Sequence, residues 1–216
     1  MSDGLQITEI FKSIQGESTW AGLPCVFVRT AGCDLRCAWC DSAYSRDGGA
    51  WMTLDAILQR VRELDCPLVE ITGGEPLLQE ATPDLARRLQ AAGCTVLVET
   101  NGAQPIEVLP DGVIRIMDLK CPDSGECGRN RVANVEQLKP YDEVKFVLAS
   151  RRDYEWARDR IAAYALASKV KAVLLSVAFG ALPAAQVVQW MLEDRLPARF
   201  QLQLQKFIWE PGRRGV

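Results

Sequence analysis

Short apolar runs rich in β-branched residues recur along the chain, and each is followed by a turn and then by a segment with helical spacing. Continuous apolar runs of this length, bounded by Gly, Pro, Asn and Asp, predict strands buried on both faces. We predict seven strands, over residues 26–30, 68–72, 95–99, 113–118, 143–148, 172–177 and 200–204. The chain has no internal repeat and no long linker between these runs.

The segments between the runs carry apolar residues three or four positions apart, which predicts helices. Thr53 has a side chain suited to a helix N-cap, and the apolar positions of residues 54–64 follow a period near 3.6. Further helices are predicted from Thr82 to Gly93, over 152–167 and over 183–194.

Strands that alternate with helices favour a parallel sheet covered by helices. The 216 residues fall short of the ~250 that a full eight-fold barrel needs. A doubly wound sheet fits the same pattern, but an incomplete barrel suits this length better. We therefore predict one α/β domain over residues 1–216, a partial (βα) barrel of about six parallel strands.

Composition narrows the partners of such a domain. The 28 acidic residues outnumber the 25 basic ones, so no basic field is present to hold a nucleic-acid backbone. No run of about 20 apolar residues predicts a membrane span, and the N-terminal residues lack the pattern of a secretion signal. These features predict a cytoplasmic protein without a nucleic-acid or membrane partner.

The absence of histidine and the presence of eight cysteines limit the chemistry. Without imidazole, a Ser-His-Asp or Cys-His hydrolase and a histidine-ligated zinc site are excluded. Acid–base work would fall to carboxylates, Lys, Cys or Tyr. In a reducing compartment the cysteines are expected to remain thiols or to bind metal.

Unusual residues follow the predicted strands at their C-terminal ends, where parallel α/β folds place their chemistry. Cys33 follows the first strand, and Thr72-Gly73-Gly74-Glu75-Pro76 ends the second. Glu99-Thr100-Asn101-Gly102 ends the third, Asp118-Leu119-Lys120 the fourth, and Ser176 lies near the end of the sixth. This placement predicts one shared site.

Cys33, Cys37 and Cys40 form a Cys-x3-Cys-x2-Cys array in a loop. Three thiolates around a four-iron cluster leave one iron open for an exogenous ligand, whereas closed clusters and structural zinc sites take four. The alternatives are a zinc site completed by a distant cysteine and thiols without a function.

The array resembles the signature of the radical S-adenosylmethionine (SAM) superfamily. The resemblance implies a [4Fe–4S] cluster on Cys33, Cys37 and Cys40 that cleaves SAM into a radical. Residues 72–76 resemble the GGEP motif of that superfamily, which accepts the amino group of the methionine moiety. Glycines there allow backbone carbonyls to approach a ligand closely.

Further segments are similar to the 7-carboxy-7-deazaguanine synthase family, in the same order and over nearly the whole chain. These segments are residues 14–18, 27–32, 40–42, 99–102 and 213–216. The resemblance implies the ring contraction of 6-carboxy-5,6,7,8-tetrahydropterin with loss of ammonia, as a step toward queuosine. It also implies a homodimer and an electron donor such as flavodoxin or ferredoxin.

The same resemblance assigns roles to individual residues. The pterin would contact Ile14, Gln15, Gly16, Arg29 and Thr72, with Arg29 pairing with its carboxylate. SAM would contact Trp39, Cys40, Asp41 and Gly74, with Asp118, Leu119, Lys120 and Ser176 as further candidates. Ser42 would be a ligand of Mg²⁺, and Glu99 would contact the substrate or move a proton.

The polar side chains of Arg29, Ser42 and Glu99 could instead have purely structural roles. Arg29 could form a salt bridge, Ser42 could cap a helix or form an Asx-type turn, and Glu99 could accept hydrogen bonds from backbone donors. Rival functions remain open as well. One is an activating enzyme that installs a glycyl radical on a protein, and another is a zinc or iron–sulfur binding module without turnover.

Two features depart from the family pattern. Gln205 stands where the family usually has histidine, and glutamine cannot carry a positive charge. Cys121 and Cys127 are surplus thiols in a Pro/Gly loop, where they could hold an auxiliary metal or be incidental.

Overall fold

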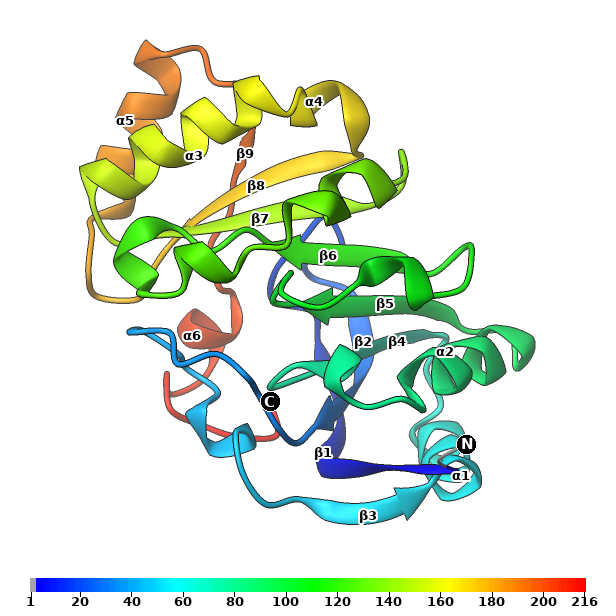
Figure 1. The fold of residues 1–216 in the computed structure, drawn as a ribbon. Coiled ribbons are helices and arrows are strands. Elements are labelled where there is room, and N and C mark those ends of the chain that lie inside the picture. The colour runs from blue at the N-terminus through cyan, green and yellow to red at the C-terminus, as the bar shows by residue number, and fades with distance from the viewer. Residues whose placement is uncertain (1–2) are drawn as a thin grey trace.

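The computed structural model describes residues 3–216, which form one nine-stranded sheet in the order β3-β1-β2-β4-β5-β6-β7-β8-β9. The strands are β1 (Gly4–Ile14), β2 (Pro24–Thr30), β3 (Ala50–Thr53), β4 (Leu68–Gly73), β5 (Thr95–Thr100), β6 (Ile114–Asp118), β7 (Glu143–Leu148), β8 (Ala172–Val177) and β9 (Arg199–Phe200). From β2 through β4 to β9 every neighbouring pair is parallel, whereas β1 pairs antiparallel with β2 and β3. The sheet does not close into a barrel, which confirms the predicted partial barrel (Figure 1).

The sequence pattern missed β1 and β3, which extend the sheet beyond the predicted parallel strands. A register shift between Ile7 and Glu9 interrupts the pairing of β1 with β2. Because a bulge of this kind breaks the two-residue alternation of buried and exposed side chains, the strand has no clean periodic signal. The predicted strand over 200–204 is also shorter, since the ladder to β8 covers Arg199 and Phe200.

The helices are α1 (Leu54–Leu64), α2 (Thr82–Ala91), α3 (Arg151–Ala163), α4 (Leu166–Lys169), α5 (Ala184–Glu193) and α6 (Gln205–Ile208). Thr53 caps α1 as predicted, because its side chain accepts a hydrogen bond from the Ala56 N–H at 3.2 Å. The single helix predicted over 152–167 is interrupted at Ala165, whose φ of 50° is left-handed. The connections from β5 to β6 and from β6 to β7 contain short 3-10 turns in place of α-helices.

The helices cover one face of the sheet, α1 and α2 over its N-terminal half and α3 to α5 over its C-terminal half (Figure 1). On β2, the side chains of Val26 and Val28 belong to the hydrophobic core between the sheet and helices α1 and α2. The alternate residues Cys25 and Phe27 belong to a smaller inner cluster, and Arg29 follows them on the same inner face. The inner face therefore changes from apolar to charged toward the C-terminal end of the strands.

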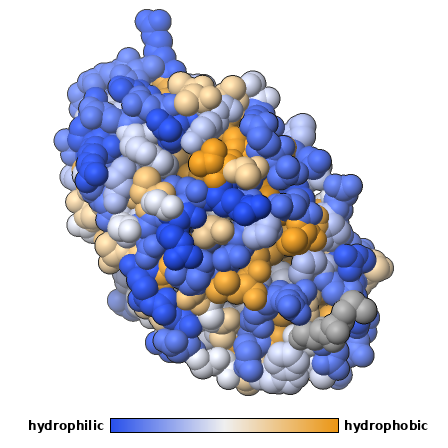
Figure 2. Space-filling view, viewed as in Figure 1, coloured by the Kyte–Doolittle hydropathy of each residue, from blue (hydrophilic) through white to orange (hydrophobic). Residues whose placement is uncertain are grey.

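The surface in Figure 2 is mainly hydrophilic, with apolar side chains in small separate groups. Within residues 3–216, the structure contains no helix with the length and apolar character of a membrane span.

The loop between β1 and β2 reaches across the open side of the barrel. The Leu204 N–H donates to the Gly16 carbonyl at 3.0 Å, and the Thr19 N–H donates to the Glu143 carboxylate at 3.0 Å. Both ends of the curved sheet are thereby joined without a strand ladder. Ile14 at the end of β1 and the loop residues Gln15 and Gly16 are those that the family resemblance places in the substrate site.

A buried ion pair joins β6 to the start of β7. Arg115 Nη1 lies 3.1 Å from Asp142 Oδ2, and the two side chains are 3% and 0% exposed. Asp142 also accepts hydrogen bonds from the backbone N–H groups of Arg115 and Lys139. The carboxylate thus orders the turn that precedes β7.

Asp142→Ala should destabilise the fold strongly, because it leaves the Arg115 guanidinium buried without a counter-charge. We expect a loss of ~3–5 kcal/mol in the free energy of unfolding, measured by urea titration. Glu63→Ala, which removes the exposed pair of Glu63 with Arg60, is the control and should change it by less than about 1 kcal/mol. Similar losses in the two variants would contradict the structural role of the buried pair.

Candidate active site

A cavity of about 490 Å³ opens at the C-terminal ends of the parallel strands. It is lined by the β1–β2 loop, the cysteine loop, the ends of β2 and β4 to β7, and the C-terminal residues 211–216. The residues of the predicted site that line it are Ile14, Gln15, Gly16, Arg29, Cys33, Cys37, Trp39, Cys40, Asp41, Ser42, Thr72, Gly74, Glu99, Asp118 and Lys120. The fold thus brings these residues, which come from separate segments of the chain, to one cavity.

Two of the candidates lie elsewhere. Leu119 is 2% exposed and packs into the core under α3. Ser176 is 2% exposed on β8 and lines a smaller pocket beside Phe179 and Phe207. Their side chains do not line the large cavity.

The cysteine loop is held firmly at its base. Arg36 Nη1 donates to the Cys33 carbonyl at 2.8 Å, and its backbone N–H donates to Glu126 at 2.6 Å. The Glu75 N–H donates to the Gly32 carbonyl at 2.8 Å, which ties the glycine motif to the start of this loop. A Cβ added at Gly74 would lie 2.1 Å from the Gly32 carbonyl oxygen. Glycine is therefore required where the two segments touch.

The three thiols suit a four-iron cluster with one open iron. Cys33, Cys37 and Cys40 are half-buried and come from one loop beside the cavity, and no fourth cysteine of residues 3–216 lines it. Cys121 is buried in the core behind β6 and β7, away from the cavity lining. Burial raises the pKa of the Cys33 and Cys37 thiols, so coordination to iron would supply the charge that keeps them ionised.

Within residues 3–216, no three His, Cys, Asp or Glu side chains are gathered around the position of a single metal ion.

Glu75 fixes the glycine motif to the end of β5. Its fully buried carboxyl group accepts hydrogen bonds from the Asn101 N–H at 2.6 Å, Thr100 Oγ1 at 2.8 Å and the Leu77 N–H at 2.9 Å. Burial outweighs these bonds and raises the pKa of Glu75 to about 7. The Glu75 side chain thus holds the loop, while the glycines face the cavity.

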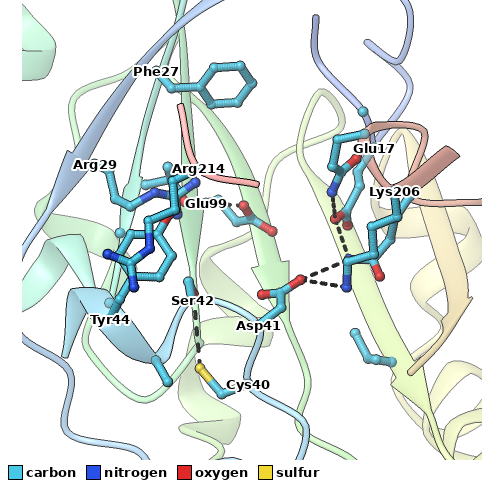
Figure 3. Close-up of a pocket in the computed structure, with 18 of the residues that line it drawn as sticks. Glu17, Phe27, Arg29, Cys40, Asp41, Ser42, Tyr44, Glu99, Lys206 and Arg214 are labelled. Carbon is cyan, nitrogen blue, oxygen red and sulfur yellow. Dashed lines mark hydrogen bonds and ion pairs between the residues drawn. The ribbon is translucent and has the colours of Figure 1, made fainter. Parts of the chain in front are cut away.

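Arg29 lies at one wall of the cavity with an aromatic neighbour (Figure 3). Its Nε donates to Glu9 Oε1 at 2.8 Å, and the Tyr44 hydroxyl donates to the same oxygen at 2.7 Å. Arg29 therefore does form a salt bridge, with Glu9, but this salt bridge occupies only the Nε of the guanidinium group. The two Nη groups make no hydrogen bond within residues 3–216 and can receive a carboxylate. Arg214 also stacks on Tyr44, with its guanidinium carbon 4.0 Å from the ring centroid.

A buried ammonium group, that of Lys145 on β7, lies among three carboxylates at the cavity. Lys145 Nζ lies 3.0 Å from Glu17 Oε2 and 3.6 Å from Asp118 Oδ1, and it also pairs closely with Glu99. Burial acts to lower the pKa of Lys145, but these three carboxylates together raise it well above its usual value. Sequence reasoning missed Lys145 as a site residue, although a charged residue in the apolar run 143–148 was a usable signal.

Glu99 makes its hydrogen bonds with side chains. Besides Lys145, it accepts a hydrogen bond from Thr72 Oγ1 at 3.2 Å. The proposed alternative, in which Glu99 satisfies backbone donors, is not what the structure shows. Glu99 instead lines the cavity, as Arg29 does, and both are labelled in Figure 3.

Ser42 and Asp41 line the cavity next to the last cysteine (Figure 3). Ser42 precedes the 3-10 turn Ala43–Ser45 but its side chain makes no capping hydrogen bond, and its Oγ lies 4.0 Å from Cys40 Sγ. Asp41, whose side chain is 50% exposed, pairs with Lys206 at 2.9 Å, and this charge outweighs partial desolvation and lowers the pKa of the Asp41 carboxyl group. The Ser42 hydroxyl thus remains available to a ligand.

Gln205, at the position of the family histidine, contacts the β1–β2 loop. Its Nε2 donates to Glu17 Oε1 at 3.2 Å, and Gln203 donates to the same oxygen at 2.9 Å. Its Oε1 is buried without a hydrogen-bond partner and lies against Gly16, where an added Cβ would be 1.8 Å away. Gln205 therefore holds Glu17 through its neutral amide group.

Comparison with known proteins agrees with this geometry. The model of the radical SAM superfamily matches residues 27–117. The chain is 47% identical to a 7-carboxy-7-deazaguanine synthase of Koribacter versatilis, over 98% of this chain and 100% of that protein. It is 45% identical to a 7-carboxy-7-deazaguanine synthase of Chlorobaculum tepidum, over 98% of this chain and 97% of that protein.

Among solved structures, QueE from Escherichia coli superposes with a TM-score of 0.71 at 20% identity, covering 93% of this chain and 94% of that one. Streptococcus suis SuiB bound to its precursor peptide SuiA superposes with a TM-score of 0.60 at 17% identity, covering 81% of this chain and 47% of that one. At these identities the two likenesses support the fold.

Gly74→Ala should impair cluster assembly, because the new methyl group would push the glycine motif away from the cysteine loop. We expect iron and sulfide content after anaerobic reconstitution to fall several-fold, together with the visible absorbance of the cluster. Gly128→Ala is the control, since a Cβ there meets no atom within 4 Å. Normal iron loading of Gly74→Ala would show that the close approach of the two segments is dispensable.

Proposed function

The chain belongs to the 7-carboxy-7-deazaguanine synthase family of radical SAM enzymes, and from this we propose that its cavity converts 6-carboxy-5,6,7,8-tetrahydropterin to 7-carboxy-7-deazaguanine with loss of ammonia. One observation supports this function above the others. Three half-buried thiols of one loop share a cavity with an arginine whose Nη groups are unpaired and with a carboxylate held by a buried lysine. The site thus combines a place for a cluster with groups for an acidic heterocycle.

Cys33, Cys37 and Cys40 would hold the [4Fe–4S] cluster, which supplies the electron that cleaves SAM. SAM would lie along Trp39, Asp41 and Gly74, with the backbone of the glycine motif next to its amino group. Asp118 and Lys120 form an ion pair of 2.5 Å on the same side of the cavity and complete this part of the site. Leu119 and Ser176 would act indirectly, as neighbours of the residues that line it.

The pterin would occupy the part of the cavity between Arg29 and the β1–β2 loop. The two Nη groups of Arg29 present parallel donors to a carboxylate, while Glu9 fixes Nε from behind. Ile14, Gln15, Gly16 and Thr72 line the remaining walls. A carboxylated bicyclic ring therefore meets a cation at one end and hydrogen-bonding groups around its edge.

Glu99 is our candidate for proton movement in the ring contraction. Loss of ammonia requires protons to reach and leave ring nitrogens and carbons, and the chain has no histidine to carry them. Lys145 and Thr72 hold the Glu99 carboxylate at the cavity wall in one orientation. A carboxylate positioned in this way can accept a proton from the substrate and return it.

Other parts of the assignment rest on the family. Mg²⁺ would bind the Ser42 hydroxyl together with substrate oxygens and water, which suits its preference for oxygen ligands. A flavodoxin or ferredoxin would deliver the electron, and two chains would form a homodimer. The eight free thiols fit a reducing, cytoplasmic environment.

Anaerobic incubation of the reduced, cluster-loaded protein with SAM and 6-carboxytetrahydropterin should yield 7-carboxy-7-deazaguanine, detected by mass spectrometry. Cys37→Ser should lose cluster iron and product together, because it removes one of three thiolate ligands. Cys94→Ser, a cysteine away from the cavity, is the control and should retain both. Cleavage of SAM without this product would rule out the proposed substrate.

Glu99→Gln should lower kcat by about 10²- to 10⁴-fold, the usual contribution of a positioned acid or base. Iron content and SAM binding should remain normal, because Glu99 does not contact the cysteine loop among the described residues. Glu107→Gln, outside the cavity, serves as the control. A kcat close to that of the wild type would exclude Glu99 from proton transfer.

A further inference from the structure

Glu70 is a buried acid on the inner face of β4 for which the proposed chemistry has no role. It is 2% exposed and lies two residues before Thr72, so both side chains point into the barrel. In the ladder between β2 and β4, Glu70 is opposite Phe27, and Thr72 is opposite Arg29. Glu70 therefore lines the cavity one layer deeper than Arg29.

The Glu70 carboxyl group has one oxygen in use and one available. Gln15 Nε2 donates to Glu70 Oε2, and Gln15 Oε1 accepts the Glu17 N–H at 3.0 Å. The Gln15 amide is thereby fixed in one orientation. Among residues 3–216, Gln15 is the hydrogen-bond partner of this carboxyl group, and Glu70 Oε1 is not one of the unpartnered polar atoms sealed from solvent. Oε1 consequently faces the cavity.

A carboxyl group so deeply buried is expected to have more than one hydrogen-bond partner. Burial, followed by the nearby charge of Glu99, raises the pKa of Glu70 well above its usual value. Whether the group is neutral or ionised, one oxygen keeps a lone pair that can accept an N–H. The structure therefore has an acceptor at the floor of the cavity that lacks a donor.

The surroundings of this acceptor suit a flat ring. Phe27, its neighbour across the ladder, lines the cavity and stacks on Phe11 with a centroid distance of 5.1 Å. The cavity is also polarised along its depth, with the cation of Arg29 in the upper layer and the carboxyl group of Glu70 below. A ligand with a carboxylate at one end and N–H donors at the other matches this order of charges.

We propose that Glu70 is a specificity-determining residue, whose free oxygen accepts a hydrogen bond from the 2-amino group of the pterin. The inference rests on the proposed function, since it takes the pterin as the occupant of the cavity. In this arrangement the carboxylate binds Arg29 and the amino-substituted ring reaches the floor, where Gln15 and Glu70 meet. A heterocycle without the amino group would leave the acceptor buried and unpaired.

The test compares two stable ligands, pterin-6-carboxylate and 4-oxopteridine-6-carboxylate, which has hydrogen in place of the 2-amino group. Binding to the cluster-loaded protein with SAM is measured by anaerobic equilibrium dialysis, with ligand fluorescence as the readout. Wild type should bind the amino compound about tenfold or more tightly, because the site is built around a donor. Glu70→Met, which keeps the length of the side chain without its oxygens, should reduce this preference to about twofold or less.

Glu143→Met is the matched control. Glu143 is also fully buried and also bonds to the β1–β2 loop, through Thr19, but it does not line the cavity. This variant should keep the preference of the wild type even if loosening of the loop weakens both ligands. Glu70→Gln, which restores an oxygen acceptor, should recover part of the preference lost in Glu70→Met.

Equal affinity of wild type for the two ligands would overturn the inference, and this result does not depend on the folding of any variant. An unchanged preference in Glu70→Met would overturn it as well. Failure of pterin-6-carboxylate to bind the wild type would have a different meaning, because it would remove the pterin from the proposed function and the inference with it.

Discussion

The ammonium group of Lys145 is the charge on which the interior of this barrel depends. Glu17, Glu99 and Asp118 come from three different parts of the chain and converge on it. Buried carboxylates without a counter-charge would repel one another and favour protonation or local opening. Lys145 on β7 therefore lets β5 and the β1–β2 loop bring their acids to one cavity, and it orients the Glu99 carboxylate at the same time. The acid from β6, Asp118, is shared between Lys145 and Lys120.

A second constraint is the contact between two backbone segments. Gly74 lies so close to the Gly32 carbonyl that no side chain fits between them, and the Glu75 N–H bonds to that same carbonyl. These contacts set the cysteine loop against the glycine motif. The arrangement explains how three thiols and a ligand-binding backbone, far apart in sequence, come to share one edge of the cavity.

The substitution of glutamine for the usual histidine at position 205 acts through the same network. Gln205 and Gln203 donate to Glu17, whose other oxygen pairs with Lys145. The Gln205 side chain carries no charge, so Lys145 supplies the cation beside Glu17. The C-terminal segment and the β1–β2 loop are fastened together by amide side chains where the sheet itself stays open.

The sequence by itself determined the α/β class, the parallel strands, most helices and the cavity-lining cysteines and glycines, because each depends on local periodicity or close spacing. It did not show β1 and β3, because a bulge disturbs the alternation of β1 and because the four residues of β3 are too few for a periodic signal. The tertiary structure alone decided that Glu9 holds Arg29, that Lys145 gathers three acids and that Glu70 contacts Gln15. Such pairings join residues from distant segments, and their geometry follows from the register and curvature of the sheet, which no local pattern encodes.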